Sequence, residues 1–151
     1  MKTNLILLAC VLLFSTCKKK NTDSQATIDE KAIQKYISDN KVGATITTAS
    51  GLHYVITTQG TGATPVSSSA VTVVYDGFLV DGSLFDQSPA SGTSFNLSGV
   101  IKGWQEGLTY FKKGGKGTLL IPSALGYGPQ GSGSIPANAV LIFNLQLVDV
   151  R

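Results

Sequence analysis

Charged residues are scarce in this chain: they make up 14% of its 151 residues, against roughly 25% in an average soluble domain. Histidine occurs once, as His53, and the two cysteines are Cys10 and Cys17. Beyond Cys17, a cysteine–histidine zinc site and a cysteine nucleophile are therefore excluded. No serine lies in the G-x-S-x-G sequence that carries the nucleophile of many hydrolases. We expect a protein that uses no metal, no cofactor and no covalent intermediate.

The few charges are distributed unevenly. From residue 51 onward, five basic side chains are balanced by five carboxylates, so the formal net charge of +3 arises within the first 50 residues. A neutral body offers no basic face that could neutralise phosphate groups, which argues against a nucleic-acid-binding protein. Hydrophobic residues make up 42% of the chain, which is enough for a core and excludes an intrinsically disordered protein.

Long hydrophobic runs are also missing, because the run from Leu5 to Phe14 covers only ten residues, about half a bilayer core as a helix. After Met1-Lys2, this run predicts a signal peptide of residues 1–16. The end of the run, LFSTC, resembles the lipobox of bacterial lipoproteins. We therefore expect export and lipidation of Cys17, with an anchor in the outer membrane facing the periplasm. A plain secretory signal, which would leave Cys17 as a free thiol, is the alternative.

The mature chain divides into three parts. Residues 17–26 are predicted to be a polar tether, and residues 27–50 a helical extension. Thr27 and Glu30 have the spacing of a capping box, which predicts one short helix over about residues 28–39. Such a helix is too short to be stable alone, so it must dock on the rest of the protein or fray.

Residues 51–151 have the pattern of a sheet with one helix. Apolar alternation predicts strands at residues 52–57, 71–76, 118–121 and 140–150, with a hairpin turn at Asp81-Gly82. A short helix is expected over residues 102–111, although Gly103 and Gly107 lower its intrinsic stability. The fold class is therefore α+β, with an antiparallel sheet packed by one helix. His53 is expected to be a half-exposed strand residue.

Four sequence motifs in this region carry a family resemblance. Residues 73–79 and 81–86 (VVYDGFL and DGSLFD) resemble the V-x-Y-x-G-x-L and D-G-x-x-F-D signature of FKBP-type peptidyl-prolyl cis-trans isomerases. Residues 100–107 (VIKGWQEG), 121–128 (IPSALGYG) and 135–143 (IPANAVLIF) are similar to the later motifs of the same family. The lead-in at residues 50–54, SGLHY, is typical of its bacterial lipoprotein subgroup.

The resemblance implies a half-wrapped antiparallel sheet around a short helix, with a shallow apolar pocket between them. Carried over by position, the implied catalytic residues are Tyr75, Phe85, Asp86, Ile101, Trp104, Tyr127 and Phe143, and the implied substrate-binding residues are Phe95, Val100 and Ile135. Trp104 would form the pocket floor, while the Ile101 N–H and the Tyr127 hydroxyl would each donate to a substrate carbonyl. Two segments depart from the family: residues 87–94 lack the basic partner usual for Asp86, and the loop 129–134 is short.

The implied function is rotation of X–Pro peptide bonds in exported proteins, by an apolar aromatic pocket without covalent catalysis. The implied partners are proline-containing polypeptides and macrolide ligands, and we expect a monomer because the helical extension is short. A non-catalytic chaperone or scaffold of the same fold, which binds proline without rotating it, is the alternative.

The lipid anchor can be tested by replacing Cys17→Ser. Because lipidation requires the thiol, we expect this variant to move from the membrane fraction to the soluble periplasmic fraction on cell fractionation. A variant that stays in the membrane fraction would contradict the lipobox interpretation.

Overall fold

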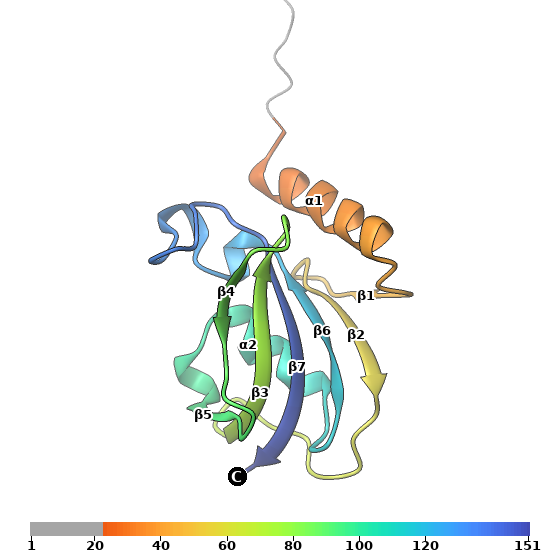
Figure 1. The fold of residues 1–151 in the computed structure, drawn as a ribbon, viewed down its shortest axis with the longest axis vertical. Helices are drawn as coiled ribbons and strands as arrows, with labels where there is room; N and C mark the ends of the chain where they lie inside the picture. Colours follow the sequence, from red (N-terminus) through yellow and green to blue (C-terminus); the bar gives the residue numbers. More distant parts are fainter. Residues whose placement is uncertain (1–22) are drawn as a thin grey trace, which may run out of the picture.

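The computed structural model describes residues 23–151 and has one sheet with a helix on each face (Figure 1). Cys17 and the predicted signal peptide lie outside the described residues. The strands of the described part are β1 (Ile46–Thr47), β2 (His53–Thr58), β3 (Ala70–Leu79), β4 (Leu84–Gln87), β5 (Thr93–Asn96), β6 (Lys116–Ile121) and β7 (Leu141–Val150). Their order is β1-β2-β6-β7-β3-β4, with β5 also paired to β3, and all pairs are antiparallel. The α+β expectation is confirmed.

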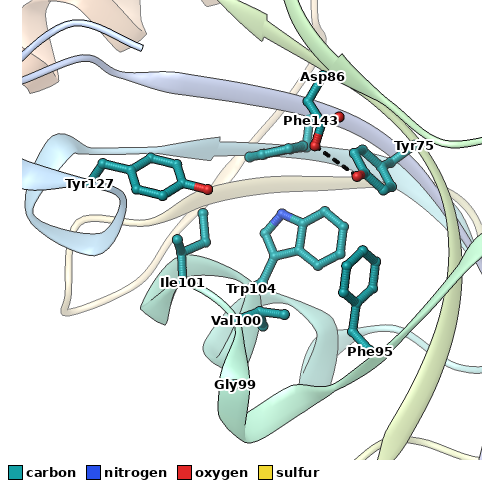
Figure 2. A pocket seen from close by; sticks show the side chains of 9 residues that line it. All are labelled: Tyr75, Asp86, Phe95, Gly99, Val100, Ile101, Trp104, Tyr127 and Phe143. Atoms are coloured by element: carbon teal, nitrogen blue, oxygen red, sulfur yellow. Dashed lines mark hydrogen bonds between the residues drawn. The ribbon is translucent and has the colours of Figure 1, made fainter. Parts of the chain in front are cut away.

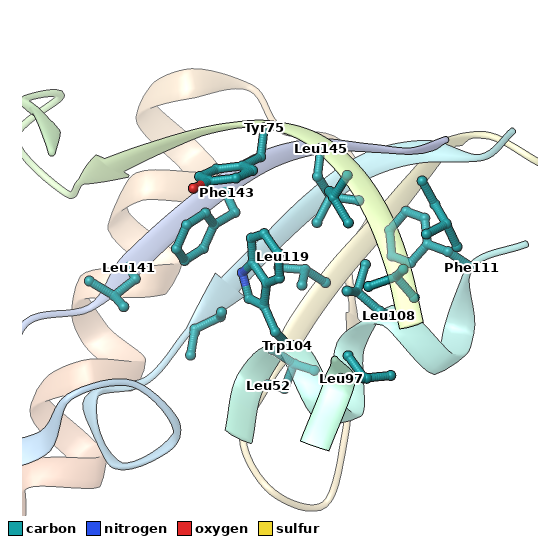
Figure 3. Close-up of a cluster of buried hydrophobic side chains, with 14 of the residues drawn as sticks. Leu52, Tyr75, Leu97, Trp104, Leu108, Phe111, Leu119, Leu141, Phe143 and Leu145 are labelled. Carbon is teal, nitrogen blue, oxygen red and sulfur yellow. The ribbon is translucent and has the colours of Figure 1, made fainter. Parts of the chain in front are cut away.

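The predicted inward face of the last strand is confirmed. Leu141, Phe143, Leu145 and Leu147 of β7 are each at most 5% exposed and belong to the main core cluster. Alternate residues of β3, the long strand paired to β7, join the same cluster. This apolar alternation defines the sheet face on which the pocket is built (Figure 3).

Helix α2 (Lys102–Gly107) packs on that face and continues as a 3₁₀ turn, Leu108–Tyr110. The helix lies so close to β6 that a Cβ added at Gly103 would be 2.5 Å from Cγ2 of Ile121. A Cβ at Gly107 would be 2.7 Å from Cδ1 of Leu119. The two glycines, unfavourable for the helix by itself, are thus what allow it to pack against the sheet.

Helix α1 (Gln25–Asn40) packs on the opposite face of the sheet, near the ends of β6 and β7 (Figure 1). Ile33 of α1 is fully buried against Leu120, Val140 and Ile142. These residues alternate with the ones that face α2, so the end of β6 and the start of β7 are buried on both faces. Of the two expected outcomes for this helix, docking and fraying, the structure shows docking on the sheet. No helix within residues 23–151 has both the length and the apolar character needed to cross a bilayer.

The start of α1 differs from the prediction. The helix begins at Gln25, and its cap is Ser24, whose Oγ accepts a hydrogen bond from Thr27 N–H at 3.3 Å. The predicted capping box of Thr27 and Glu30 is wrong, because Ser24 offers the same kind of oxygen one turn earlier. Glu30 is directed instead toward the sheet. The helix therefore includes residues 25 and 26, which were assigned to the tether.

The expectation that His53 is half-exposed is also wrong, since its side chain is fully buried. Its Nε2 lies 2.8 Å from Oε2 of Glu30 on α1, and its Nδ1 lies 3.0 Å from Oγ1 of Thr47 on β1. The docked helix covers this part of β2, which the strand pattern alone does not indicate. His53 thus links the helix to the sheet edge.

The close contact of α2 with β6 can be tested by Gly103→Ala. Overpacking in a core usually costs about 1–3 kcal/mol, which exceeds the ~1 kcal/mol that alanine gains over glycine in a helix. We therefore expect a lower free energy of unfolding in urea. Gly99→Ala is the control, because a Cβ there meets no atom within 4 Å. Equal stability of both variants would contradict the packing.

Candidate functional site

A pocket of about 290 Å³ opens between α2 and the sheet (Figure 2). It is lined by Tyr75, Asp86, Phe95, Gly99, Val100, Ile101, Trp104, Tyr127 and Phe143. Eight of these nine residues were predicted from the sequence. Gly99 was not, since a residue without a side chain leaves no chemical signal in the pattern.

Trp104 lies at the centre of the pocket and is 4% exposed. Its indole makes edge-to-face contacts with Tyr75, Phe95 and Phe143, at centroid separations of 5.0, 5.4 and 5.1 Å. Edge-to-face pairs are a favoured aromatic geometry and contribute beyond the buried area alone. The four rings therefore hold one another in fixed orientations and give the pocket a rigid apolar floor.

The indole Nε1 of Trp104 is the one buried side-chain nitrogen or oxygen in residues 23–151 without a hydrogen-bond partner. Figure 2 shows this atom on the side of the ring that faces Tyr127 and Phe143. Burying a donor without an acceptor usually costs about 1–3 kcal/mol. The indole N–H is thus an unpaired donor buried at the floor of the pocket.

Tyr75 and Asp86 form a polar pair at one side of the pocket. The Tyr75 hydroxyl donates to Oδ2 of Asp86 at 2.8 Å, and Gln87 N–H donates to Oδ1 at 2.9 Å. Burial raises the pKa of Tyr75 well above its ordinary value, and the Asp86 carboxylate raises it further. Tyr75 therefore stays protonated. Its hydroxyl and the Gln87 N–H bind the exposed Asp86 carboxylate, and so take the role of the basic residue that segment 87–94 lacks.

The opposite wall is the chain that leads into α2. Val100 and Ile101 have extended backbones, and the Ile101 carbonyl accepts the first hydrogen bonds of the helix, from Trp104 and Gln105 N–H. The Gln105 side chain turns back, and its Nε2 donates to the Val100 carbonyl at 2.7 Å. Gln105 thus fixes the wall, a function that sequence reasoning missed because a glutamine on a short helix carries no distinctive signal.

Tyr127 covers the pocket from a loop. Its side chain is 40% exposed, and Figure 2 shows its hydroxyl directed across the pocket. The tyrosine lies between two 3₁₀ turns, Ser123–Leu125 and Gly128–Gln130, and Asn138 N–H closes the loop by donating to the Gly128 carbonyl at 2.8 Å. No hydrogen bond within residues 23–151 involves the Tyr127 hydroxyl, so it is free to donate to a bound molecule.

Two residues implied by the resemblance do not line this pocket. Phe85 packs against Phe143, with an edge-to-face contact at 5.5 Å and 88°, and does not line the cavity. Ile135 is 8% exposed and belongs to the core cluster. It also forms an isolated antiparallel bridge with Ser132. Phe85 thus supports a pocket residue from outside the cavity, and Ile135 is part of the core. Within the described residues, no cluster of three or more histidine, cysteine, aspartate or glutamate side chains could hold a metal ion.

Comparison with known proteins identifies the family of the chain. Residues 62–148 match the family model described as FKBP-type peptidyl-prolyl cis-trans isomerase. The chain belongs to this family. The matched segment contains all nine residues that line the pocket, while α1 and β2 lie outside it.

Several curated FKBP-type isomerases resemble the chain. The probable FKBP-type peptidyl-prolyl cis-trans isomerase FkpA of Neisseria meningitidis is 50% identical over 107 residues, which cover 69% of this chain and 39% of that protein. FkpA of Aeromonas hydrophila is 41% identical over 136 residues, covering 88% of this chain and 51% of that protein. The chain thus spans about half or less of these two relatives.

Solved FKBP-type structures share the fold. The crystal structure of FkpA from Escherichia coli has a TM-score of 0.75 and 41% identity, and covers 83% of this chain and 61% of that one. A peptidyl-prolyl cis-trans isomerase from Pseudomonas syringae has a TM-score of 0.71 and 34% identity, and the match covers 85% of this chain and 98% of that one. The FKBP-like fold, with an antiparallel sheet, a short helix and an N-terminal helix, is confirmed.

Occupation of the pocket can be followed by fluorescence, because Trp104 is the single tryptophan of the chain. A short proline-containing peptide that fills the pocket changes the surroundings of the indole, so we expect a saturable change of its emission. The same peptide with alanine in place of proline is the control. A response that is equal for both peptides, or does not saturate, would contradict binding at this pocket.

Proposed function

We propose that the protein is a peptidyl-prolyl cis-trans isomerase acting on X–Pro bonds of polypeptide clients. The observation that carries the proposal is the rigid aromatic pocket around Trp104, with unpaired hydrogen-bond donors at its floor and rim. Family membership supports the same reaction. A pocket of about 290 Å³ is large enough for a prolyl ring and too small for a folded segment.

The reaction is the rotation of one amide bond, for which the barrier is about 18–20 kcal/mol because resonance must be broken. In the twisted state the C–N bond has lost its double-bond character and much of its dipole. An apolar, water-excluding pocket therefore favours the twisted amide over the planar one. No ionisable nucleophile or base is needed, which agrees with a site whose tyrosine is held protonated.

Six of the nine pocket residues have a stated role in this proposal. The rings of Tyr75, Trp104 and Phe143 hold the prolyl ring and exclude water. The Asp86 carboxylate fixes the orientation of the Tyr75 ring through their hydrogen bond. The Tyr127 hydroxyl and the Ile101 N–H donate to the carbonyls that flank the rotating bond and keep the peptide in a turn.

The energy required is modest. A ten-thousandfold acceleration needs about 5.5 kcal/mol of binding that is stronger in the transition state than in the ground state. Burial of a prolyl ring contributes at roughly 25 cal/mol per Å², and each hydrogen bond adds about 0.5–1.5 kcal/mol. Only the part of this sum that grows on twisting accelerates the reaction.

We extend the proposal to the setting of the protein. We propose that the protein is exported and that Cys17 carries the lipid that anchors it to a bacterial membrane. The proposed membrane is the outer membrane, with the protein facing the periplasm. The folded part, which we propose to be monomeric, would then act on exported clients, and macrolides that mimic a prolyl ring are proposed as competing ligands. The near-neutral charge of residues 51–151 supports binding of neutral, apolar segments rather than charged ones.

The proposal can be tested with a client protein whose refolding is limited by proline isomerisation. We expect the wild-type protein to accelerate this slow phase, and Phe143→Leu to lower kcat/KM at least roughly tenfold, about 1.4 kcal/mol of transition-state binding. Leucine keeps this position apolar, so the fold should survive.

Phe111→Leu is the matched control, because Phe111 is a fully buried ring of the same core that does not line the pocket. It should lose stability and keep its activity. A wild-type protein that binds proline peptides without accelerating refolding would support the alternative, a non-catalytic chaperone or scaffold. Equal losses of activity in both variants would contradict a catalytic pocket.

A further inference from the structure

Asp29 is a buried carboxylate far from the pocket in sequence. It lies on α1 and is 2% exposed. Its Oδ2 accepts two hydrogen bonds from Ser123, from the backbone N–H at 2.8 Å and from Oγ at 2.6 Å. Its Oδ1 accepts a third, from Nε2 of Gln25 at 2.7 Å. None of the ion pairs within residues 23–151 includes Asp29, so neutral donors alone compensate the burial of its charge.

Ser123 begins the segment that carries Tyr127. The 3₁₀ turn Ser123–Leu125 has Pro122 as its cap residue, and proline has no side-chain acceptor for the first N–H of the turn. Asp29 supplies that acceptor from another element. The fixed position of Ser123 also constrains the residues that follow, because Gly126 N–H donates to the Ser123 carbonyl at 3.0 Å. Tyr127 is the next residue.

The Tyr127 side chain itself has little packing to fix it, because it is 40% exposed. Its position therefore depends on the backbone that precedes it. Helix α1, in contrast, is well anchored to the sheet by the buried Ile33 and by the contact between Glu30 and His53. Asp29 thus joins an anchored helix to a partly exposed loop.

We propose that Asp29 is a positioning residue that acts through Ser123 to place the Tyr127 hydroxyl over the pocket. The inference rests on the proposed isomerase function for its kinetic consequence. It assigns a part in the site to α1, which lies outside the segment that matches the family model. In this view the N-terminal helix is a component of the binding site as well as a cover for the sheet.

The test is a double-mutant cycle of Asp29→Ala and Tyr127→Phe, assayed by kcat/KM on a proline-containing peptide. Each single variant should lose about tenfold or less, the value of one hydrogen bond. If Asp29 acts through the Tyr127 hydroxyl, adding Asp29→Ala to Tyr127→Phe should cause little further loss. Independent effects multiply, so a multiplicative loss would overturn the proposal.

Loss of stability alone is controlled by Ile33→Val, which removes one buried methyl group from the same helix without touching Ser123. This variant should be less stable and fully active. If it does lose some kcat/KM, that loss should multiply with the loss caused by Tyr127→Phe. Should Asp29→Ala fail to fold, Ser123→Ala removes only the Oγ donor. Adding Ser123→Ala to Tyr127→Phe should then cause little further loss of kcat/KM. A multiplicative loss in this pair would overturn the proposal.

A readout without activity separates this inference from the proposed function. Amide hydrogen exchange of Leu125 and Gly126, whose N–H groups are bonded within the turn, should speed up in Asp29→Ala while exchange in β7 stays unchanged. A wild-type protein without isomerase activity would contradict the proposed function, yet selective acceleration at these two amides would still support the coupling. Unchanged exchange there would overturn it.

Discussion

The close packing of α2 against β6 is the contact on which the pocket depends. Gly103 and Gly107 bring the helix backbone within van der Waals distance of Ile121 and Leu119. Trp104 follows Gly103 directly, so its indole is held between the helix and the sheet, where three other rings meet it edge to face (Figure 2). A helix only slightly farther away would leave space beneath the indole, and the rigid floor would be lost. The helix propensity that the two glycines cost is offset by this packing.

The sheet is covered on both faces at the end of β6 and the start of β7, which gives α1 a structural role of its own. Residues of β6 and β7 alternate between the pocket face and the face covered by α1, where Leu120 and Ile142 are fully buried. Without the helix these side chains would be exposed to water. The pocket face and the α1 face share the same two strands, so the helix stabilises the scaffold of a site that it does not line.

Much of the fold could be predicted from the sequence, because its signals are local: alternation along residues 140–150 indicates the buried face of β7. Most of the pocket residues came instead from the resemblance of four motifs to the FKBP-type family, since the pattern of aromatic residues alone does not distinguish a pocket from a core. The predicted cap of α1 was wrong because Ser24 and Thr27 both offer a hydroxyl oxygen within one turn of each other. The contact of Asp29 with Ser123 could not be predicted: 94 residues separate them, and neither type is unusual at its position. Long-range pairing of common residues leaves no pattern in one sequence.

The two tyrosines that line the pocket differ in what their hydroxyl groups can still do. The Tyr75 hydroxyl is already committed to Asp86, and the raised pKa of Tyr75 keeps that proton in place. It therefore orients a ring and has no donor left for a ligand. Tyr127 has no such partner among the described residues, and its hydroxyl is directed over the same space as the unpaired Nε1 of Trp104. An apolar pocket with a free hydroxyl donor and one fixed carboxylate suits the ligand that we propose, a prolyl peptide, which combines an apolar ring with backbone carbonyls.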